Sequence, residues 1–259
     1  LIENGLDPTV LLGADLAELH GKNFRKGSDS LFVLEACEYK RAFHNYHPSI
    51  LLINTLDPDH LDYYHDFADY MDAFEEFSRK LPRDGFIFAN IDDEDCHEIL
   101  KKMQEHHFPP YNMFTYGKSS PAADFFMDGM TVYKKGVAVG KLELSVPGEH
   151  NRLNALAAFS IASTLGLAPA SILRSLNSYK GAHRRFQMKG TIGKKTVVID
   201  DYGHHPAEIK ATLQAAREKY PTEKICLVFQ PHQYSRTKKL IDGFASAFDK
   251  ADLVVIPNI

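Results

Sequence analysis

Residues 196–213 read TVVIDDYGHHPAEIKATL and join a β-branched run to an amphipathic one. The run at 196–199 predicts a buried strand, and Pro206 suits the first position of the helix that follows. Two carboxylates, a phenol and two imidazoles therefore stand between the end of a strand and the start of a helix. Open α/β sheets bind ligands at this place, because polar loops converge there and helix N-termini favour anions. The alternative is that the acids cap the helix and the histidines are exposed loop residues.

Strands and helices alternate on both sides of this stretch. After residue 180 the pattern predicts strand 196–200, helix 206–219, strand 225–229, helix 236–249 and strand 253–256. Earlier apolar runs predict strands at 31–34, 50–53 and 86–89, and helical spacing predicts helices at 67–81, 96–107 and 153–165. Residues 124–146 alternate around glycine-containing turns, which predicts antiparallel strands.

These elements predict an α/β fold with two domains, each built around a mainly parallel sheet. The pattern restarts after Gly181, so we expect one domain over residues 1–181 and a second over 182–259. The chain opens like the end of a helix and stops just after a strand, so we expect both ends to lie within a longer protein.

Composition excludes several classes of partner. The 259 residues carry a formal net charge of −4, and no basic block indicates nucleic-acid binding. No apolar run approaches the roughly 18 residues of a membrane span. The three cysteines are scattered, which fits a reducing compartment, and we expect a cytoplasmic protein. The sequence leaves the oligomeric state open.

Two residues that follow predicted strands are candidate metal ligands. Glu35 ends the first strand and His60 follows the second, and we expect these two strands to be buried neighbours, so that Glu35 and His60 lie close together. A carboxylate at a strand end beside a phosphate site is a usual magnesium ligand, whereas magnesium prefers oxygen to histidine nitrogen. A hydrogen-bonded loop is the alternative.

A third group opens the helix after residue 148. His150, Asn151 and Asn154 lie within its first turns, where side chains three or four residues apart share a face. One Asn is expected as a cap, and a second needs another reason. An amide offers both a donor and an acceptor to a planar base, although double capping is the alternative.

The segment FQPHQYSRT, residues 229–237, repeats the layout of strand, polar loop and helix. Its Arg236 suits a two-point grip on a carboxylate or phosphate. Arg185 lies at the proposed domain boundary, where a cation could reach a ligand.

Together these segments resemble the Mur ligase family, and within it the branch that adds alanine. The matching pieces are EACEY (35–39), DPDHLDYY (57–64), GEHNRLNALAA (148–158), RRF (184–186), DDYGHHPAEIKATL (200–213) and FQPHQYSRT (229–237). They occur in the family's order, and the fifth and sixth are specific.

The resemblance implies a central ATPase-type domain and part of a Rossmann-like C-terminal domain. It also implies a ligase that uses ATP and Mg²⁺ to join L-alanine to UDP-N-acetylmuramate through an acyl phosphate, in peptidoglycan precursor synthesis. The glycine-rich phosphate loop of the family does not occur in these 259 residues and is expected before Leu1. We therefore expect the chain alone to be inactive.

Roles for single residues also follow from the resemblance. Glu35 and His60 correspond to metal ligands, and Asn151 and Asn154 to amides that face the adenine, with His150 beside them. The further nucleotide contacts it implies are Arg185 and Asp201. The residues it places around the alanine and the acyl phosphate are Tyr202, His204, His232 and Arg236. Both loops follow predicted strands of one βαβ unit, so we expect residues 201–205 and 232–236 to face each other. His204 or His232 is preferred as proton acceptor over His205, which precedes Pro206 and is expected to lead into the helix.

The chain departs from the family pattern at three positions. Cys37 replaces an Asp in the Glu-Ala-Asp-Glu motif, Asp57 stands in place of a Glu in the segment before His60, and Gln233 stands where the family often has Arg. Two other interpretations stay open: a ligase of the same family that attaches a whole murein peptide, and a nucleotide-binding chain without catalysis.

We predict that Glu35→Gln and His60→Ala each lower the turnover of the full-length protein by on the order of 100-fold, because each removes a ligand of the ion that stabilises transition-state charge. Steady-state phosphate release measures this loss. Near-normal turnover in both variants would contradict the assignment.

Overall fold

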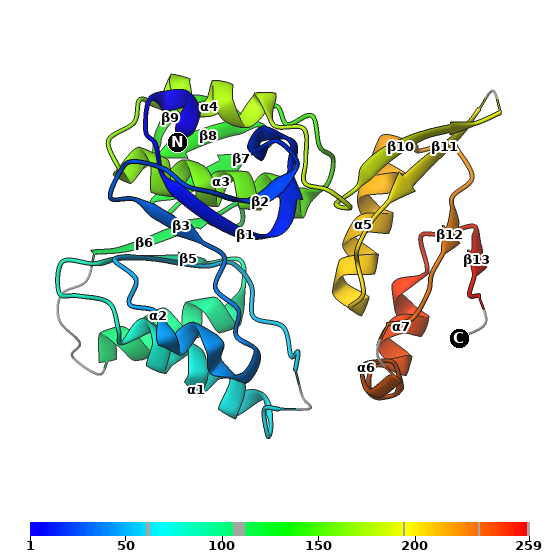
Figure 1. Ribbon diagram of the computed structural model, residues 1–259, viewed down its shortest axis with the longest axis horizontal. Coiled ribbons are helices and arrows are strands. Elements are labelled where there is room, and N and C mark those ends of the chain that lie inside the picture. The colour runs from blue at the N-terminus through cyan, green and yellow to red at the C-terminus, as the bar shows by residue number, and fades with distance from the viewer. Residues whose placement is uncertain (61–62, 106–111, 194, 233, 258–259) are drawn as a thin grey trace. The chain divides into compact units, whose positions relative to one another are not determined.

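A computed structural model describes residues 1–60, 63–105, 112–193, 195–232 and 234–257 (Figure 1). The chain forms two compact units. The first unit comprises Leu1–Leu12, Lys26–Glu143 and Leu153–Asn177, and the second comprises Gly13–Arg25, Leu144–Arg152 and Ser178–Ile259. The domain division at residues 181–182 stays a prediction.

The first unit is built on a six-stranded sheet. Its strands follow chain order: β4 (Ile50–Ile53), β5 (Phe86–Asn90), β6 (Asn112–Gly117), β7 (Phe125–Asp128), β8 (Thr131–Lys134) and β9 (Val137–Lys141). Pairing is parallel from β4 to β7 and antiparallel from β7 to β9. The predicted antiparallel strands after residue 124 are confirmed, with glycines of positive φ at both turns.

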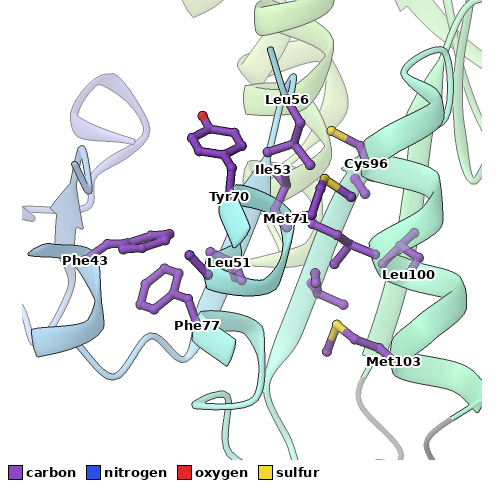
Figure 2. Close-up of a cluster of buried hydrophobic side chains, with 14 of the residues drawn as sticks. Phe43, Leu51, Ile53, Leu56, Tyr70, Met71, Phe77, Cys96, Leu100 and Met103 are labelled. Carbon is purple, nitrogen blue, oxygen red and sulfur yellow. The ribbon is translucent and has the colours of Figure 1, made fainter. Parts of the chain in front are cut away.

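Helices cover this sheet. α1 (Phe67–Ser78) and α2 (Glu94–Glu105) pack on β4 and β5 through Met71, Phe77, Ile99 and Met103, the core that Figure 2 shows. The adjacent β5 residues Ile87 and Phe88 are both fully buried, although successive residues of a strand point to opposite faces. β5 is therefore covered on both faces, as its continuous apolar sequence indicates.

Two further helices follow β9. α3 (Glu149–Thr164) contributes Phe159, whose ring lies 6.2 Å from that of Phe125 on β7. Gly166, at φ 87°, ends α3 and donates its N–H to Ser163, as the sequence predicts. α4 (Pro169–Ser178) was not indicated by the pattern.

A small separate sheet has the order β2 (Lys22–Arg25), β1 (Thr9–Leu16), β3 (Phe32–Leu34). Short 3₁₀ helices lie at Ile2–Asn4, Ala17–Leu19 and Tyr39–Asn45. β3 pairs with β1, whereas β4 pairs with β5. The expectation that the strands before Glu35 and His60 are neighbours is therefore wrong, and so is the burial predicted for the first, because Phe32 is 58% exposed.

The second unit contains β10 (Gln187–Ile192), β11 (Thr196–Asp200), α5 (Pro206–Lys219), β12 (Cys226–Val228), α6 (Tyr234–Lys239), α7 (Ile241–Ala247) and β13 (Leu253–Val255). β12 and β13 pair in parallel. Ile209 and Leu213 of α5 pack with Phe229 and with Phe244 of α7.

The α/β class is confirmed, with three corrections in the second unit. β11 pairs antiparallel with β10, a strand that the pattern did not indicate. β11 is not hydrogen-bonded into the sheet of β12, so the predicted βαβαβ series is not one parallel sheet within the described residues. The helix predicted at 236–249 is two helices, and the second begins after Leu240. Gly243 of α7 lies against Pro206, where an added Cβ would come within 3.1 Å of the proline ring.

We predict that Ile99→Ala lowers the free energy of unfolding by about 2–5 kcal/mol, because Ile99 is fully buried between α2 and the sheet and its loss leaves a cavity. Lys101→Ala on the exposed face of α2 is the control and changes it by about 0.5 kcal/mol or less. Urea unfolding followed by circular dichroism measures both. Equal midpoints for the two variants would contradict this account of the core.

Candidate functional site

The loop that follows β4 brings His60 to two carboxylates. His60 Nε2 lies 3.2 Å from Glu38 Oε1 and 3.9 Å from Asp59 Oδ2. The ring of Tyr39 packs on the imidazole with centroids 4.7 Å apart. His60 has φ 54°, an uncommon conformation for a residue with a side chain, and its N–H donates to Asp59 Oδ1 at 2.7 Å. The backbone thus turns sharply to hold the ring beside Glu38.

A second layer of contacts supports Glu38. Its backbone carbonyl accepts the hydroxyl of Tyr64 at 2.5 Å. Burial raises the pKa of Tyr64 to about 12, and Arg41 partly opposes this shift. Arg41, at φ 54°, pairs with Asp69 at 2.5 Å and Glu76 at 2.7 Å, both on α1. The loop that carries Glu38 is thereby tied to a helix of the core.

This donor set suits a cation in its chemistry. Carboxylate oxygens from Glu38 and Asp59 are the ligands that Mg²⁺ prefers, and His60 adds a nitrogen. Within the described residues, however, no three His, Cys, Asp or Glu side chains already form a group that could hold a metal ion. Glu35 follows β3, is exposed, and donates its N–H to the Leu11 carbonyl at 3.0 Å. The magnesium role of Glu35 and His60 stays a prediction.

A chain of hydrogen bonds orients Asn154 of α3. The Tyr116 hydroxyl donates to Asn54 Oδ1 at 2.5 Å, and Asn54 Nδ2 donates to Asn154 Oδ1 at 3.1 Å. Tyr116 is fully buried at the end of β6, and burial raises the pKa of its phenol. Because the phenol stays protonated, Tyr116 donates its hydrogen to Asn54, and Asn54 in turn donates to the amide oxygen of Asn154. The amide nitrogen of the exposed Asn154 therefore points away from Asn54.

The start of α3 is shaped by a glycine. Gly148 has φ 100°, and an added Cβ would lie 2.7 Å from the His150 ring and 3.0 Å from the Ala215 methyl. Burial lowers the pKa of His150, although the residue as a whole remains exposed. Asn151 Nδ2 donates to the Pro147 carbonyl at 2.6 Å. In this bond the Asn151 amide acts as a donor to a carbonyl and does not cap a helix N–H, so it does not support the double-capping alternative.

Asp201 lies in the loop that joins β11 to α5, and its carboxylate holds this loop in place. Figure 1 shows the two elements that the loop connects. Its Oδ2 accepts the Phe186 N–H at 2.8 Å, and its Oδ1 accepts the Gly203 N–H at 2.8 Å. Phe186 and Arg184 adopt φ 48° and 56°, so the 184–186 turn is strained. Asp201 therefore holds two neighbouring loops together by its backbone contacts.

Glu208 holds the same loop from the other side. Its Oε2 accepts the N–H of His204 at 2.9 Å and that of His205 at 3.2 Å, and its Oε1 lies 3.4 Å from Arg185 Nη1. The pKa of Glu208 is lowered: burial would raise it, but the His204 N–H and the charges of His204 and Arg185 outweigh burial.

Tyr202 and His204 lie at the exposed side of this loop. Their rings meet edge to face with centroids 5.2 Å apart. The guanidinium of Arg184 lies 4.9 Å from the Tyr202 ring centre, and that of Arg185 lies 5.9 Å away. His204 Nδ1 is 3.1 Å from the Tyr202 carbonyl oxygen. The structure thus brings together Arg185, Asp201, Tyr202 and His204, all predicted site residues.

His205 is the N-cap of α5, and its Nδ1 accepts the Ala207 N–H at 3.4 Å. This agrees with the expectation that His205 leads into the helix. His232 is exposed between β12 and α6. The side chain of Arg236 and the whole of Gln233 lie outside the described residues. That the loops at 201–205 and 232–236 face each other stays a prediction.

Comparison with known protein families shows which family the chain belongs to. Residues 18–162 match the Mur ligase middle domain, and residues 184–257 match the Mur ligase, glutamate ligase domain. The chain belongs to the Mur ligase family. This confirms the resemblance inferred from the motifs.

Individual Mur ligases extend the comparison. UDP-N-acetylmuramate–L-alanine ligase of Clostridium kluyveri is 42% identical over 266 residues, which cover 100% of this chain and 56% of that protein. The ligase of the same name from Thermotoga maritima has a solved structure with a TM-score of 0.80 at 31% identity, covering 99% of this chain and 56% of that one. A murein peptide ligase from Psychrobacter arcticus shares the fold, with a TM-score of 0.70 at 23% identity over 99% of this chain and 58% of that one. The chain therefore spans about half the length of these Mur ligases.

Two acids of this Mur ligase were missed as site residues. Glu38 is the carboxylate that meets His60, and its signal was a second acid three residues after Glu35. Glu208 lies in the fourth position after His204, and its signal was the capping-box pattern in which an N3 Glu bonds back to the N-cap.

We predict that acid destabilises the wild-type Mur ligase more steeply than its Glu208→Gln variant. Because the folded-state pKa of Glu208 lies below its ordinary value of 4.5, the charged carboxylate stabilises the fold above pH 4.5, and this contribution is lost as the pH falls through the folded-state pKa. Glutamine cannot titrate. Urea unfolding at a series of pH values from neutral downward measures the difference, and parallel curves would contradict it.

Proposed function

We propose that the full-length protein is an ATP-dependent ligase that joins L-alanine to UDP-N-acetylmuramate, in peptidoglycan precursor synthesis. The observation that carries the proposal is the 42% identity, over the whole chain, to a ligase with that name. The match includes both units and therefore every loop that carries a candidate site residue. Support also comes from the 31% identical ligase of the same name, which shares the fold over 99% of the chain.

The geometry is compatible with this chemistry. In the proposed reaction the substrate carboxylate attacks the γ-phosphate of ATP, and the amine of alanine then displaces phosphate from the acyl phosphate. Mg²⁺ would be held by Glu35 and His60, with Glu38 beside His60, and would neutralise charge on the phosphates during transfer. The oriented amide of Asn154 would face the adenine, together with Asn151 and His150.

The second unit supplies the amino-acid end in this proposal. Arg185 and Asp201 lie beside Tyr202 and His204, which would contact the alanine and the acyl phosphate. His232 and Arg236 complete the set. Arg236 would grip the alanine carboxylate with two parallel hydrogen bonds.

We also propose a cytoplasmic location, since nucleotide-linked substrates and free thiols both suit that compartment. Cys37, Cys96 and Cys226 are free thiols. Across the described parts of the chain, no helix has the length and apolar character that a membrane crossing requires.

We predict that the full-length protein releases phosphate from ATP only when UDP-N-acetylmuramate and L-alanine are both present. A coupled phosphate assay, with each substrate omitted in turn, measures this dependence. Competition between L-alanine and a murein tripeptide then separates the two branches of the family. Preference for the tripeptide would overturn the alanine assignment, and nucleotide binding without turnover would overturn the enzymatic one.

A further inference from the structure

We propose that Glu208 is a positioning residue that fixes His204 as the proton acceptor for the incoming amine. The inference rests on the proposed function, because it assigns a role within the same reaction. Glu208 lies on α5, one helical turn after His204, and it contacts both the backbone and the ring of that histidine.

The hydrogen bond to Tyr202 selects the tautomer of His204. Nδ1 lies 3.1 Å from the Tyr202 carbonyl oxygen, and a carbonyl can only accept. Nδ1 must therefore carry the hydrogen in the neutral ring. The lone pair of the neutral imidazole then belongs to Nε2, which is the nitrogen that can accept a proton.

The Glu208 carboxylate faces the nitrogen that keeps its hydrogen. Its Oε2 lies 3.6 Å from His204 Nδ1 and accepts the backbone N–H groups of His204 and His205. The same oxygen thus fixes the peptide that carries the ring and favours the ring once it becomes positive. In the catalytic triads of acyl-transfer enzymes, a carboxylate likewise orients an imidazole and stabilises its protonated form.

The other polar and charged groups around His204 do not block the interaction between its ring and the Glu208 carboxylate. Arg185 lies 3.4 Å from Glu208 Oε1, the oxygen that does not face the ring. Tyr202 presents its ring edge to face, and Arg184 stacks on that ring while pairing with Asp200 at 3.3 Å. The Asp201 carboxylate is engaged by the N–H groups of Phe186 and Gly203. The side chains of His204 and Glu208 are 25% and 35% exposed, so water only partly screens their interaction.

The proton and electron balance of the step is complete. The ammonium of alanine gives one proton to His204 Nε2, and the freed electron pair of the amine forms the C–N bond to the acyl carbon. The C–O bond to phosphate breaks with its pair on the phosphate, and the new amide nitrogen loses its second proton to solvent. Glu208 transfers no proton in this scheme and acts through His204.

We predict that Glu208→Gln in the full-length enzyme lowers kcat/KM for L-alanine by on the order of 100-fold. The acid limb of the kcat/KM profile for alanine moves to lower pH, because the protonated ring loses the carboxylate that faces it. Glu218→Gln, the same charge change at the other end of α5, is the control with unchanged kinetics. An unmoved acid limb would overturn the proposal.

A double-mutant cycle separates positioning from a merely structural role. If Glu208 acts through His204, adding Glu208→Gln to His204→Gln causes little further loss, because residues that act as a unit are strongly non-additive. An equal loss in both backgrounds would overturn the proposal. Should Glu208→Gln fail to fold, ¹⁵N NMR of the unmutated enzyme still decides, because a hydrogen on Nε2 of neutral His204 contradicts the assignment. Wild-type enzyme without alanine-dependent phosphate release would instead refute the proposed function itself.

Discussion

The carboxylate of Glu208 connects the strand end, the helix start and the strained turn of the second unit. It accepts the N–H groups of His204 and His205, and it lies 3.4 Å from Arg185. Asp201 acts in parallel by accepting the N–H groups of Phe186 and Gly203. Two acids thus hold the loop by backbone contacts, which leaves Tyr202 and His204 at its exposed side.

The first unit uses the same principle with different residues. His60 is held in a left-handed conformation beside Glu38, and Glu38 is tied through Tyr64 and Arg41 to α1. Tyr64 is itself part of the buried core, and the partners of Arg41 lie on α1. The loop that presents His60 gains its rigidity from these anchors and from its buried residues Leu56 and Tyr64.

Both units therefore place charged loops on rigid supports, and such supports would serve the proposed ligase reaction. Reaction rates in phosphoryl transfer depend mainly on positioning and charge stabilisation. The hydrogen-bond chain from Tyr116 through Asn54 to Asn154 adds a directed amide to this set. Among the described residues, these anchors orient His60, Asn154 and His204.

The sequence by itself determined the class of fold, the family and most element positions, because apolar periodicity, glycine turns and the two specific motifs are local signals. It located α5, β4 and the antiparallel strands after residue 124 in the places where the structure has them. Only the tertiary structure decided strand pairing: β3 joins β1 and not β4, and β11 joins β10. Pairing depends on contacts between distant residues, which a local pattern does not encode. For the same reason the Glu38 carboxylate was recognised only when folding brought it to His60, whereas Glu208 lies four residues after His204 and its capping-box pattern was a local signal.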